Sequence, residues 1–319
     1  MDTTIVTEDK LIVIPSSKIF DEKKLTDLAT NGLEDNTRRA YERGLLRFFE
    51  WTNANDALFN RQTVQLYKQH LQNLDLAPAT INQSLSAIRR LASEGKYAGL
   101  DPLIADGIIA VKGVTSGGRR LGQWLSPSMV QILFDCTDPN TLRGCQERTV
   151  LSLLAGAALR RAEASSLTFE HIQLRDGVWL IANLVGKRNK TRSIPLSPWV
   201  KKNIDKWSDK AGINTGLILR AVGQNDYLTG TVRTKGGGMT NGGLSPKAIY
   251  NSVIRIADCA GIKRLGPHSL RRTWARRAYK QGFPLDQIQA VLGHESIRTT
   301  ELYLGLRGLD LESPVYVTY

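Results

Sequence analysis

Apolar residues recur at steps of three and four along the first third of the chain, which is the spacing of one face of an α-helix. Three runs with this pattern begin near Asn36, Thr63 and Pro78, and either Asp35 or Asn36 can cap the first of them. A short fourth element is expected from Leu103 to Val111. With no alternating, strand-like pattern in between, this part of the chain is predicted to be a small helical bundle.

Residues 112–123 interrupt the pattern, with four glycines, three cations and little apolar content. Glycine and serine favour a flexible connection, and cations suit a linker that follows a phosphate backbone. We therefore expect an N-terminal arm (1–24), a helical domain (25–111), this linker and a second domain with a C-terminal tail (124–319). A surface loop inside a single domain is the alternative reading of 112–123.

The second domain is expected to begin with a helix whose N-cap is Ser126 and whose first residue is Pro127. A nearly all-apolar helix follows from Glu147 to Gly156, so it is expected to be buried. Two short apolar runs, Val178–Leu184 and Arg192–Leu196, flank a basic turn and predict a β-hairpin. Helical spacing then returns in three stretches, 246–261, 271–282 and 285–292. The fold is therefore predicted to be mainly α, with a small antiparallel sheet in an α+β second domain.

The chain has 43 Lys and Arg against 30 Asp and Glu, a formal net charge of +13 over 319 residues. Such an excess favours binding to a polyanion, because neutralised phosphates release their counterions. A solvated basic face is the plainer alternative. A membrane surface is a weaker one, since no basic amphipathic segment stands out and no apolar run is long enough to span a bilayer.

Cysteine usage and the N-terminus predict a cytoplasmic protein. The three cysteines are widely spaced and form no Cys-x-x-Cys pair, which is typical of reduced thiols and not of a disulfide frame or a zinc site. The first ten residues hold three acids and no apolar stretch, so no secretory signal is expected.

A glycine-rich stretch, Lys235–Gly243, superficially suggests a phosphate-binding loop. It lacks the Gly-Lys-Ser/Thr ending of such loops and follows no evident strand, so we interpret it as a flexible loop. The four histidines are not at metal-ligand spacing either. Neither a nucleotide, a metal nor another cofactor is expected.

The candidate chemistry lies in a few polar residues of the second domain. Arg160 emerges where the apolar helix ends, with Glu163 three residues on to orient it, and an Arg fork suits two phosphate oxygens. His268 and Arg271, also three apart, share one helix face. Taken singly, such an Arg-x-x-Glu pair is usually a plain helix ion pair, and such a His usually a helix cap.

Two of the four histidines fall in the C-terminal block that ends at Tyr303, His268 and His294. A phenol has a pKa of about 10 and is a poor nucleophile near neutral pH. Surrounding arginines, histidines and a lysine would stabilise its phenolate character and the charge on a phosphate. Alone, Tyr303 is more simply a tyrosine at the edge of the core, one of nine in the chain. Together the set suits metal-free phosphoryl transfer from DNA to tyrosine.

A lysine on the tip of the predicted hairpin completes the set. Lys187 could protonate a leaving alkoxide as a general acid, with Lys190 as the rival for this role. A basic hairpin tip is more often an ordinary solvated turn, so this assignment depends on the other residues.

In this order, the motifs resemble those of the tyrosine recombinases, the phage integrase family with Xer-like and Cre-like site-specific recombinases. The resemblance covers nearly the whole chain, because residues 36–41 also look like the start of that family's helical core-binding domain. Ala158 departs from the pattern, since many members have Gly before the Leu-Arg. The motifs that carry the resemblance are Leu159-Arg160-x-x-Glu163, Gly186-Lys187 before Ile194-Pro195-Leu196, His268-x-Leu270-Arg271, Leu292-Gly293-His294, and Tyr303.

The resemblance implies a role for each of these residues. Tyr303 would attack the scissile phosphate and become joined to the DNA 3′ end, and Arg160, Arg271 and His294 would hold the non-bridging oxygens. His268 would assist proton transfer, Lys187 would protonate the leaving oxygen and Glu163 would steady the site. Further DNA contacts are expected from eight cations: Arg38, Arg39, Arg89, Arg90, Arg119, Arg120, Arg188 and Lys190.

The resemblance also implies partners and leaves two alternatives open. The two domains would form a clamp on double-stranded DNA carrying paired recombination sites, and a homotetramer would form in synapsis, with an accessory DNA-bending protein as a further partner. A type IB topoisomerase would share the tyrosine chemistry without exchanging partners. A DNA-binding regulator would keep the fold without catalysis, but the complete set of site residues argues against it.

Overall fold

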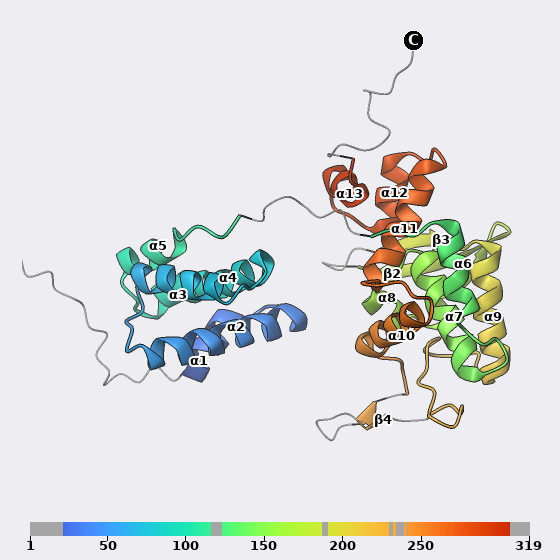
Figure 1. Cartoon of the computed structure of the whole chain (residues 1–319), viewed down its shortest axis with the longest axis horizontal. Helices are drawn as coiled ribbons and strands as arrows, with labels where there is room; N and C mark the ends of the chain where they lie inside the picture. The colour runs from blue at the N-terminus through green and yellow to red at the C-terminus, as the bar shows by residue number, and fades with distance from the viewer. Residues whose placement is uncertain are drawn as a thin grey trace, which may run out of the picture. The chain divides into compact units, whose positions relative to one another are not determined.

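The computed structural model describes residues 22–115, 123–186, 191–229, 232–233, 239–240 and 242–306. The chain divides into two compact units, Met1–Arg119 and Arg120–Tyr319 (Figure 1). This division falls within the stretch interpreted as a linker. The first linker residues nevertheless pack on the helical unit, because the Asn82 side chain exchanges hydrogen bonds with both backbone groups of Val114, at 2.9 and 2.8 Å.

Every regular element in residues 22–115 is a helix, as the apolar spacing predicted. The first helix begins at Glu22, three residues before the expected start of the domain. Apolar residues of these helices, such as Leu45, Val64 and Leu85, are fully buried and form the core of the unit. The helices are α1 (Glu22–Thr30), α2 (Asp35–Ala54), α3 (Arg61–Asn73), α4 (Pro78–Gly95), the 3-10 turn η1 (Lys96–Ala98) and α5 (Pro102–Ile109).

The helix starts are close to those predicted, with one correction. Pro78 is the first residue of α4, as expected. The expected cap of α2 is wrong: Glu34 is the N-cap residue, and its side chain makes no capping bond. Asp35 lies in the first turn instead, where its negative charge interacts favourably with the positive end of the helix dipole. Asn60 caps α3 by accepting from the Thr63 backbone N–H at 2.9 Å.

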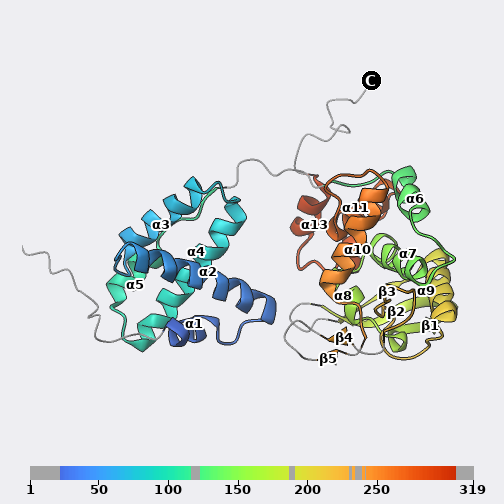
Figure 2. The same ribbon diagram turned by 60° about the horizontal axis from the view of Figure 1, so that its bottom comes forward.

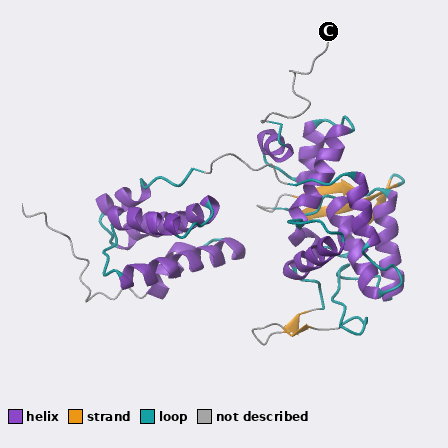
Figure 3. Ribbon diagram, in the orientation of Figure 1, coloured by secondary structure: helices purple, strands orange, loops and turns teal. Residues whose placement is uncertain are grey.

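The second unit is mainly helical with a small sheet, which confirms the predicted fold class (Figure 3). Its helices are α6 (Pro127–Asp135), α7 (Leu142–Ala155), α8 (Arg161–Ser166), η2 (Phe169–His171), α9 (Pro198–Ala211), α10 (Pro246–Cys259), α11 (Pro267–Lys280), α12 (Leu285–Leu292) and α13 (Ile297–Leu304). Its strands are β1 (Ile172–Arg175), β2 (Val178–Val185), β3 (Thr191–Pro195), β4 (Val232–Arg233) and β5 (Met239–Thr240).

The predicted hairpin is present as β2 and β3, which pair antiparallel with Ile181 opposite Ile194. A third strand, β1, pairs with β2 on the other side and was not predicted. The turn between β1 and β2 is Asp176-Gly177, and both residues have positive φ, +48° and +76°. Asp-Gly is a preferred pair for a two-residue hairpin turn, so the sequence did contain the signal for β1.

Helix α7 forms the centre of the second unit. Val150, Leu153 and Leu154 are fully buried, as expected for an apolar helix, although it begins five residues earlier than predicted. Helix α9, which the sequence analysis did not predict, packs against α7 and buries Trp207. Ser126 caps α6 by accepting from the Met129 backbone N–H at 3.2 Å, which confirms the predicted cap.

The last three helices form a second packed layer beside this core. Helices α11 and α13 lie side by side (Figure 2), and a small cluster including Ala275, Ile288, Leu292 and Leu304 fills the space among α11, α12 and α13. Within the described residues, no helix is both long and apolar enough to cross a membrane.

Candidate functional site

Arg160 is fixed at the start of α8 by the carboxylate three residues on. The Arg160 backbone N–H donates to Glu163 Oε2 and its Nη1 donates to Oε1, both at 2.7 Å. Its Nη2 donates to the carbonyls of Leu292 and Gly293, at 3.1 and 2.9 Å. Arg160 therefore reaches from α8 to the end of α12, a contact between residues more than 130 positions apart in the sequence.

The turn before Arg160 places Ala158 in a conformation that favours glycine. Ala158 has a φ of +51° and is fully buried. A left-handed backbone costs a residue with a Cβ roughly 1–2 kcal/mol, which glycine avoids. The turn directs the Ala158 carbonyl toward α11, where it accepts a hydrogen bond from Arg271 Nη1.

Arg271 lies in α11 with only 2% of its side chain exposed. Its Nη2 donates to the Leu292 carbonyl, so Arg160 and Arg271 share this acceptor. Burial, aided by the neighbouring charge of Arg160, lowers the pKa of Arg271 to about 10. The guanidinium thus stays protonated near neutral pH, and two positive charges lie against one helix end.

His294 follows the glycine that ends α12. Gly293 has a φ of +57°, the left-handed conformation usual just after a helix, and it turns the chain so that His294 comes close to Tyr303. The two rings are edge to face, with centroids 5.2 Å apart. His294 Nδ1 lies 3.0 Å from the hydroxyl of buried Thr300. When that hydroxyl donates to Nδ1, the neutral ring carries its proton on Nε2, free to donate to an anion.

Both histidines of the site favour the neutral form. Burial and the positive charges of Arg271 and Arg160 lower the pKa of His294 to about 4. The pKa of His268 is also lowered, by partial desolvation and by the charges of Arg271 and Arg161. In the DNA-free protein at neutral pH, both rings are therefore neutral, so they offer hydrogen-bonding nitrogens without adding positive charge.

Tyr303 lies near the end of α13, and its hydroxyl donates to the backbone carbonyl of His268 at 3.2 Å. The Arg272 guanidinium stacks over the phenol ring, 4.8 Å from its centre. Burial raises the pKa of Tyr303, while the positive charges of Arg271 and Arg272 act in the opposite direction. The phenol is therefore held in its protonated form, beside cations that would stabilise it once it ionises.

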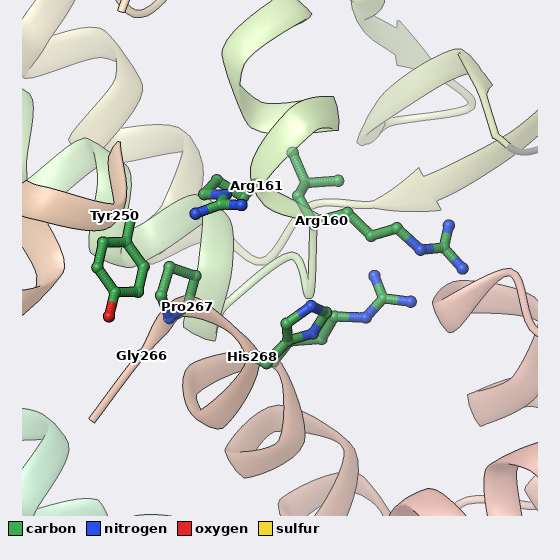
Figure 4. A pocket seen from close by; sticks show the side chains of 8 residues that line it. Arg160, Arg161, Tyr250, Gly266, Pro267 and His268 are labelled. Atoms are coloured by element: carbon green, nitrogen blue, oxygen red, sulfur yellow. The ribbon is translucent and has the colours of Figure 1, made fainter. Parts of the chain in front are cut away.

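A cavity of about 230 Å³ opens beside these residues, and His268 and Arg271 line it together (Figure 4). Tyr250 lies on one side of Pro267, and Arg160 and His268 lie on the other. Arg161 packs over the Tyr250 ring, 5.6 Å from its centre. The cavity wall thus combines cations with an aromatic ring, a surface suited to a phosphate and an attached nucleoside.

The structure thus brings together Arg160, Glu163, His268, Arg271, His294 and Tyr303, all predicted from the sequence. Lys187, Arg188 and Lys190 lie outside the described residues, as do Arg119 and Arg120. The role assigned to Lys187 therefore stays a prediction.

Four other expected DNA contacts lie in the helical unit. Arg38 and Arg39 are exposed on α2, where Arg38 pairs with Asp35. Arg89 donates to the Val111 carbonyl from its Nε at 3.0 Å, and Arg90 donates to the Ala29 and Asn31 carbonyls at 2.8 and 2.9 Å. The last two arginines thus bind parts of their own unit, and their contact with DNA stays a prediction.

Sequence reasoning missed Arg192, Arg272 and Thr300. Arg192 pairs with Glu163 Oε2 at 2.9 Å and donates from Nε to the Val291 carbonyl at 3.0 Å. No local signal in the sequence marks Arg192, since Glu163 and Val291 lie 29 and 99 positions away from it. Among the described residues, no cluster of three or more His, Cys, Asp or Glu side chains could hold a metal ion.

Comparison with known proteins places these features in a family. The phage integrase family model matches residues 123–307. The tyrosine recombinase XerD of Vibrio vulnificus (strain YJ016) is 28% identical over 277 residues, covering 85% of this chain and 85% of that protein. The tyrosine recombinase XerD of Staphylococcus aureus (strain Mu50) is 28% identical over 280 residues, covering 85% of this chain and 88% of that one.

Two solved structures have a similar fold. A lambda integrase dimer bound to a COC' core site matches with a TM-score of 0.66 at 16% identity, over 92% of this chain and 78% of that one. The XerH site-specific recombinase bound to difH substrate, in its pre-cleavage complex, matches with a TM-score of 0.61 at 21% identity, over 83% of this chain and 75% of that one.

Proposed function

This chain belongs to the phage integrase family, and on that premise we propose that it is a site-specific tyrosine recombinase that cuts and rejoins DNA through a 3′-phosphotyrosyl intermediate. The observation that carries the proposal is the position of Tyr303. Its phenol contacts the His268 backbone, lies against His294 and Arg272, and is influenced by the charge of Arg271.

The first chemical step is a transesterification. The Tyr303 oxygen attacks the scissile phosphorus as the phenol gives up its proton, and His268 assists this transfer by accepting the proton. A bond forms between the Tyr303 oxygen and phosphorus, and the bond to the 5′ oxygen breaks. That oxygen takes a proton from Lys187 and leaves as a hydroxyl.

The cations stabilise the charge that builds up on the phosphate. Arg160, Arg271 and neutral His294 donate hydrogen bonds to the non-bridging oxygens, which is electrostatic stabilisation by groups already in place. The protein carbonyls that Arg160 and Arg271 contact hold each guanidinium but use only some of its five N–H groups. We propose that further N–H groups of these guanidiniums bind the phosphate.

Rejoining reverses the first step with a different 5′ hydroxyl. The phosphotyrosyl ester conserves the energy of the broken bond, so neither ATP nor metal is needed for strand exchange. A 5′ hydroxyl from a second DNA duplex attacks the ester, and Tyr303 regains its proton.

The partners follow from this reaction. The substrate is double-stranded DNA with paired recombination sites, and the net charge of +13 supports binding to its backbone. We propose that four copies assemble in synapsis, and that an accessory DNA-bending protein brings the sites together. We also propose a cytoplasmic location for the enzyme.

The decisive test is Tyr303→Phe. A half-site selected by this protein from a random duplex pool is nicked beside the scissile phosphate, so that cleavage traps a covalent complex visible on a denaturing gel. We expect the variant to lose the complex completely while half-site affinity stays within about twofold, because the hydroxyl carries no charge. Tyr250→Phe, a tyrosine in the wall of the same cavity, serves as the matched control and should still trap.

Two outcomes would contradict this assignment. A covalent complex that persists in Tyr303→Phe would point to another nucleophile, with Tyr316 or Tyr319 next in line. A wild-type protein that relaxes supercoiled plasmid but never exchanges strands between two sites would favour the topoisomerase alternative.

A further inference from the structure

Arg192 is largely shielded from solvent although it comes directly after a basic hairpin tip. It is the second residue of β3, and only 12% of its side chain is exposed. The chain has a net charge of +13, so the removal of one more positive charge from solvent needs a structural reason. A buried guanidinium requires partners that compensate for lost hydration. Its partners therefore indicate what Arg192 is for.

One partner is the carboxylate that orients Arg160. Glu163 has 6% of its side chain exposed, and its Oε2 accepts from both the Arg160 backbone N–H and Arg192 Nη2. Arg160 and Arg192 thus share a single buried carboxylate, with Arg271 Nη1 3.9 Å away. Burial raises the pKa of Glu163, but hydrogen bonds and charges from Arg192 and Arg160 outweigh it, so the net pKa is lowered.

The other partner is the end of α12. Arg192 Nε donates to the Val291 carbonyl, one residue before the Leu292 carbonyl that Arg160 and Arg271 contact. These carbonyls lack helical partners and carry the negative end of the helix dipole, so they favour cations.

Arg192 also packs against the turn at Gly293, which sets the direction of His294. A Cβ placed on Gly293 would lie 3.0 Å from Arg192 Nη1, so the guanidinium fills the space under that glycine. His294 is the next residue. The position of His294 thus depends on a turn against which the Arg192 guanidinium packs.

We propose that Arg192 is a positioning residue of this site: by bridging Glu163 and the end of α12, it sets Arg160 and His294 in one arrangement for a single phosphate. The inference rests on the proposed function, and it connects the site to the β2–β3 hairpin, whose turn carries Lys187. Because Arg192 lies at the start of β3, next to its first residue, it ties the base of that hairpin to the two elements that hold the phosphate. Lysine could not replace it, since a single ammonium lacks a planar fork to bridge two acceptors.

The first experiment measures cleavage of the nicked half-site by Arg192→Met, Arg192→Lys and the control Arg175→Met. Arg175 lies in β1 of the same sheet and, within the part of the chain that the structure describes, hydrogen-bonds to the nearby Gln173 side chain alone. We expect Arg192→Met to slow covalent complex formation at least tenfold, Arg192→Lys to recover only part of that loss, and Arg175→Met to match the wild type. Half-site affinity should change less than about twofold in all three.

A double-mutant cycle with Glu163→Gln separates positioning from direct contact with DNA. If Arg192 acts through the carboxylate, the penalty of Arg192→Met must shrink by at least threefold in the Glu163→Gln background, since residues in one network are not additive. An equal penalty in both backgrounds would overturn the proposal. So would a loss of half-site affinity with a smaller salt dependence, because that is the signature of a lost phosphate contact.

A third measurement needs no DNA and so stands apart from the proposed function. Arg271, Arg160 and Arg192 all lower the pKa of His294. NMR titration of the four histidines, with His294 assigned through His294→Gln, should show a higher His294 midpoint in Arg192→Met than in Arg175→Met. If the wild type cleaves no DNA, the proposed function fails, but this shift still supports the link between Arg192 and His294. An unchanged midpoint and an unchanged ring signal would refute it.

Discussion

At the residue scale, the site is defined by how each charge is compensated. Five side chains, Arg160, Arg192, Arg271, Glu163 and His294, meet at the end of α12. One carboxylate and the α12 carbonyls hold three guanidinium groups together without neutralising them. The site is therefore positive before DNA arrives, and a phosphate supplies the missing negative charge.

This excess of positive charge predicts that the DNA-free protein is sensitive to mild acid. The pKa of His294 is about 4 in the folded protein, and about 6.5 is usual for an unfolded chain. Between these values the unfolded state binds a proton that the folded state does not, so stability falls as the pH falls from 6.5 toward 4. His268, whose pKa is also lowered, contributes in the same direction.

We expect His294→Gln to lose less stability than the wild type between pH 7 and pH 5, by on the order of 1 kcal/mol after allowance for the half-exposed ring. Urea unfolding at the two pH values measures the difference. The range avoids the titration of Glu163, whose pKa is lowered from its ordinary value. Equal losses in variant and wild type would contradict a neutral His294 in the folded state.

At the scale of elements, the caps and apolar spacing placed most helices correctly. Ser126 and Pro78 marked helix starts, and the apolar run of α7 marked a buried helix. The sequence analysis did not predict the helices α1, α8, α9 and α13 or the strands β1, β4 and β5, and β5 lies within the stretch 235–243 that was interpreted as a loop. Helix α9 is amphipathic and ends at a left-handed Gly212, a usual helix stop, and Asp176-Gly177 signals the β1 turn, so both could have been found from local sequence.

The hairpin between β2 and β3 carries a prediction about the two lysines that follow Gly186. We expect Lys187→Ala to slow cleavage at least tenfold more than Lys190→Ala, since a general acid contributes typically 10²–10⁴-fold. In Xer-like members of the family the lysine directly follows the glycine, as Lys187 does. Covalent complex formation on the nicked half-site measures both rates, and Lys190→Ala is the matched control.

A modified substrate tests the role itself. With sulfur in place of the 5′ bridging oxygen, the leaving group needs no proton, so cleavage by Lys187→Ala should return to near the wild-type rate. A variant that stays slow on this substrate would show that Lys187 is not the general acid.

At the scale of the whole molecule, the proposed recombination requires several copies of the chain to assemble on DNA. Residues 309–319 alternate apolar and polar positions and lie outside the described residues. An extended apolar segment can add to the sheet edge of a neighbouring subunit, and head-to-tail contacts of this kind close into a ring when the rotation allows. Folding back onto its own unit is the alternative for this tail.

We expect deletion of residues 309–319 to leave half-site binding within about twofold of the wild type, while recombination between paired sites falls at least tenfold. Gel shifts on one half-site and strand exchange on paired sites measure the two effects separately. A truncated protein that recombines at the wild-type rate would rule out docking of the tail on a neighbour.

The sequence by itself determined the helical periods, most of the helix starts and the order of the family motifs, and it predicted Tyr303 as the nucleophile, because these depend on residues close together in the chain. Only the tertiary structure revealed Arg192 as a partner of Glu163 and Val291, 29 and 99 positions away. It also placed Arg160 on the end of α12 and Ala158 in a left-handed turn. A buried charge is compensated by whichever groups the fold brings near it, and local sequence does not specify those groups.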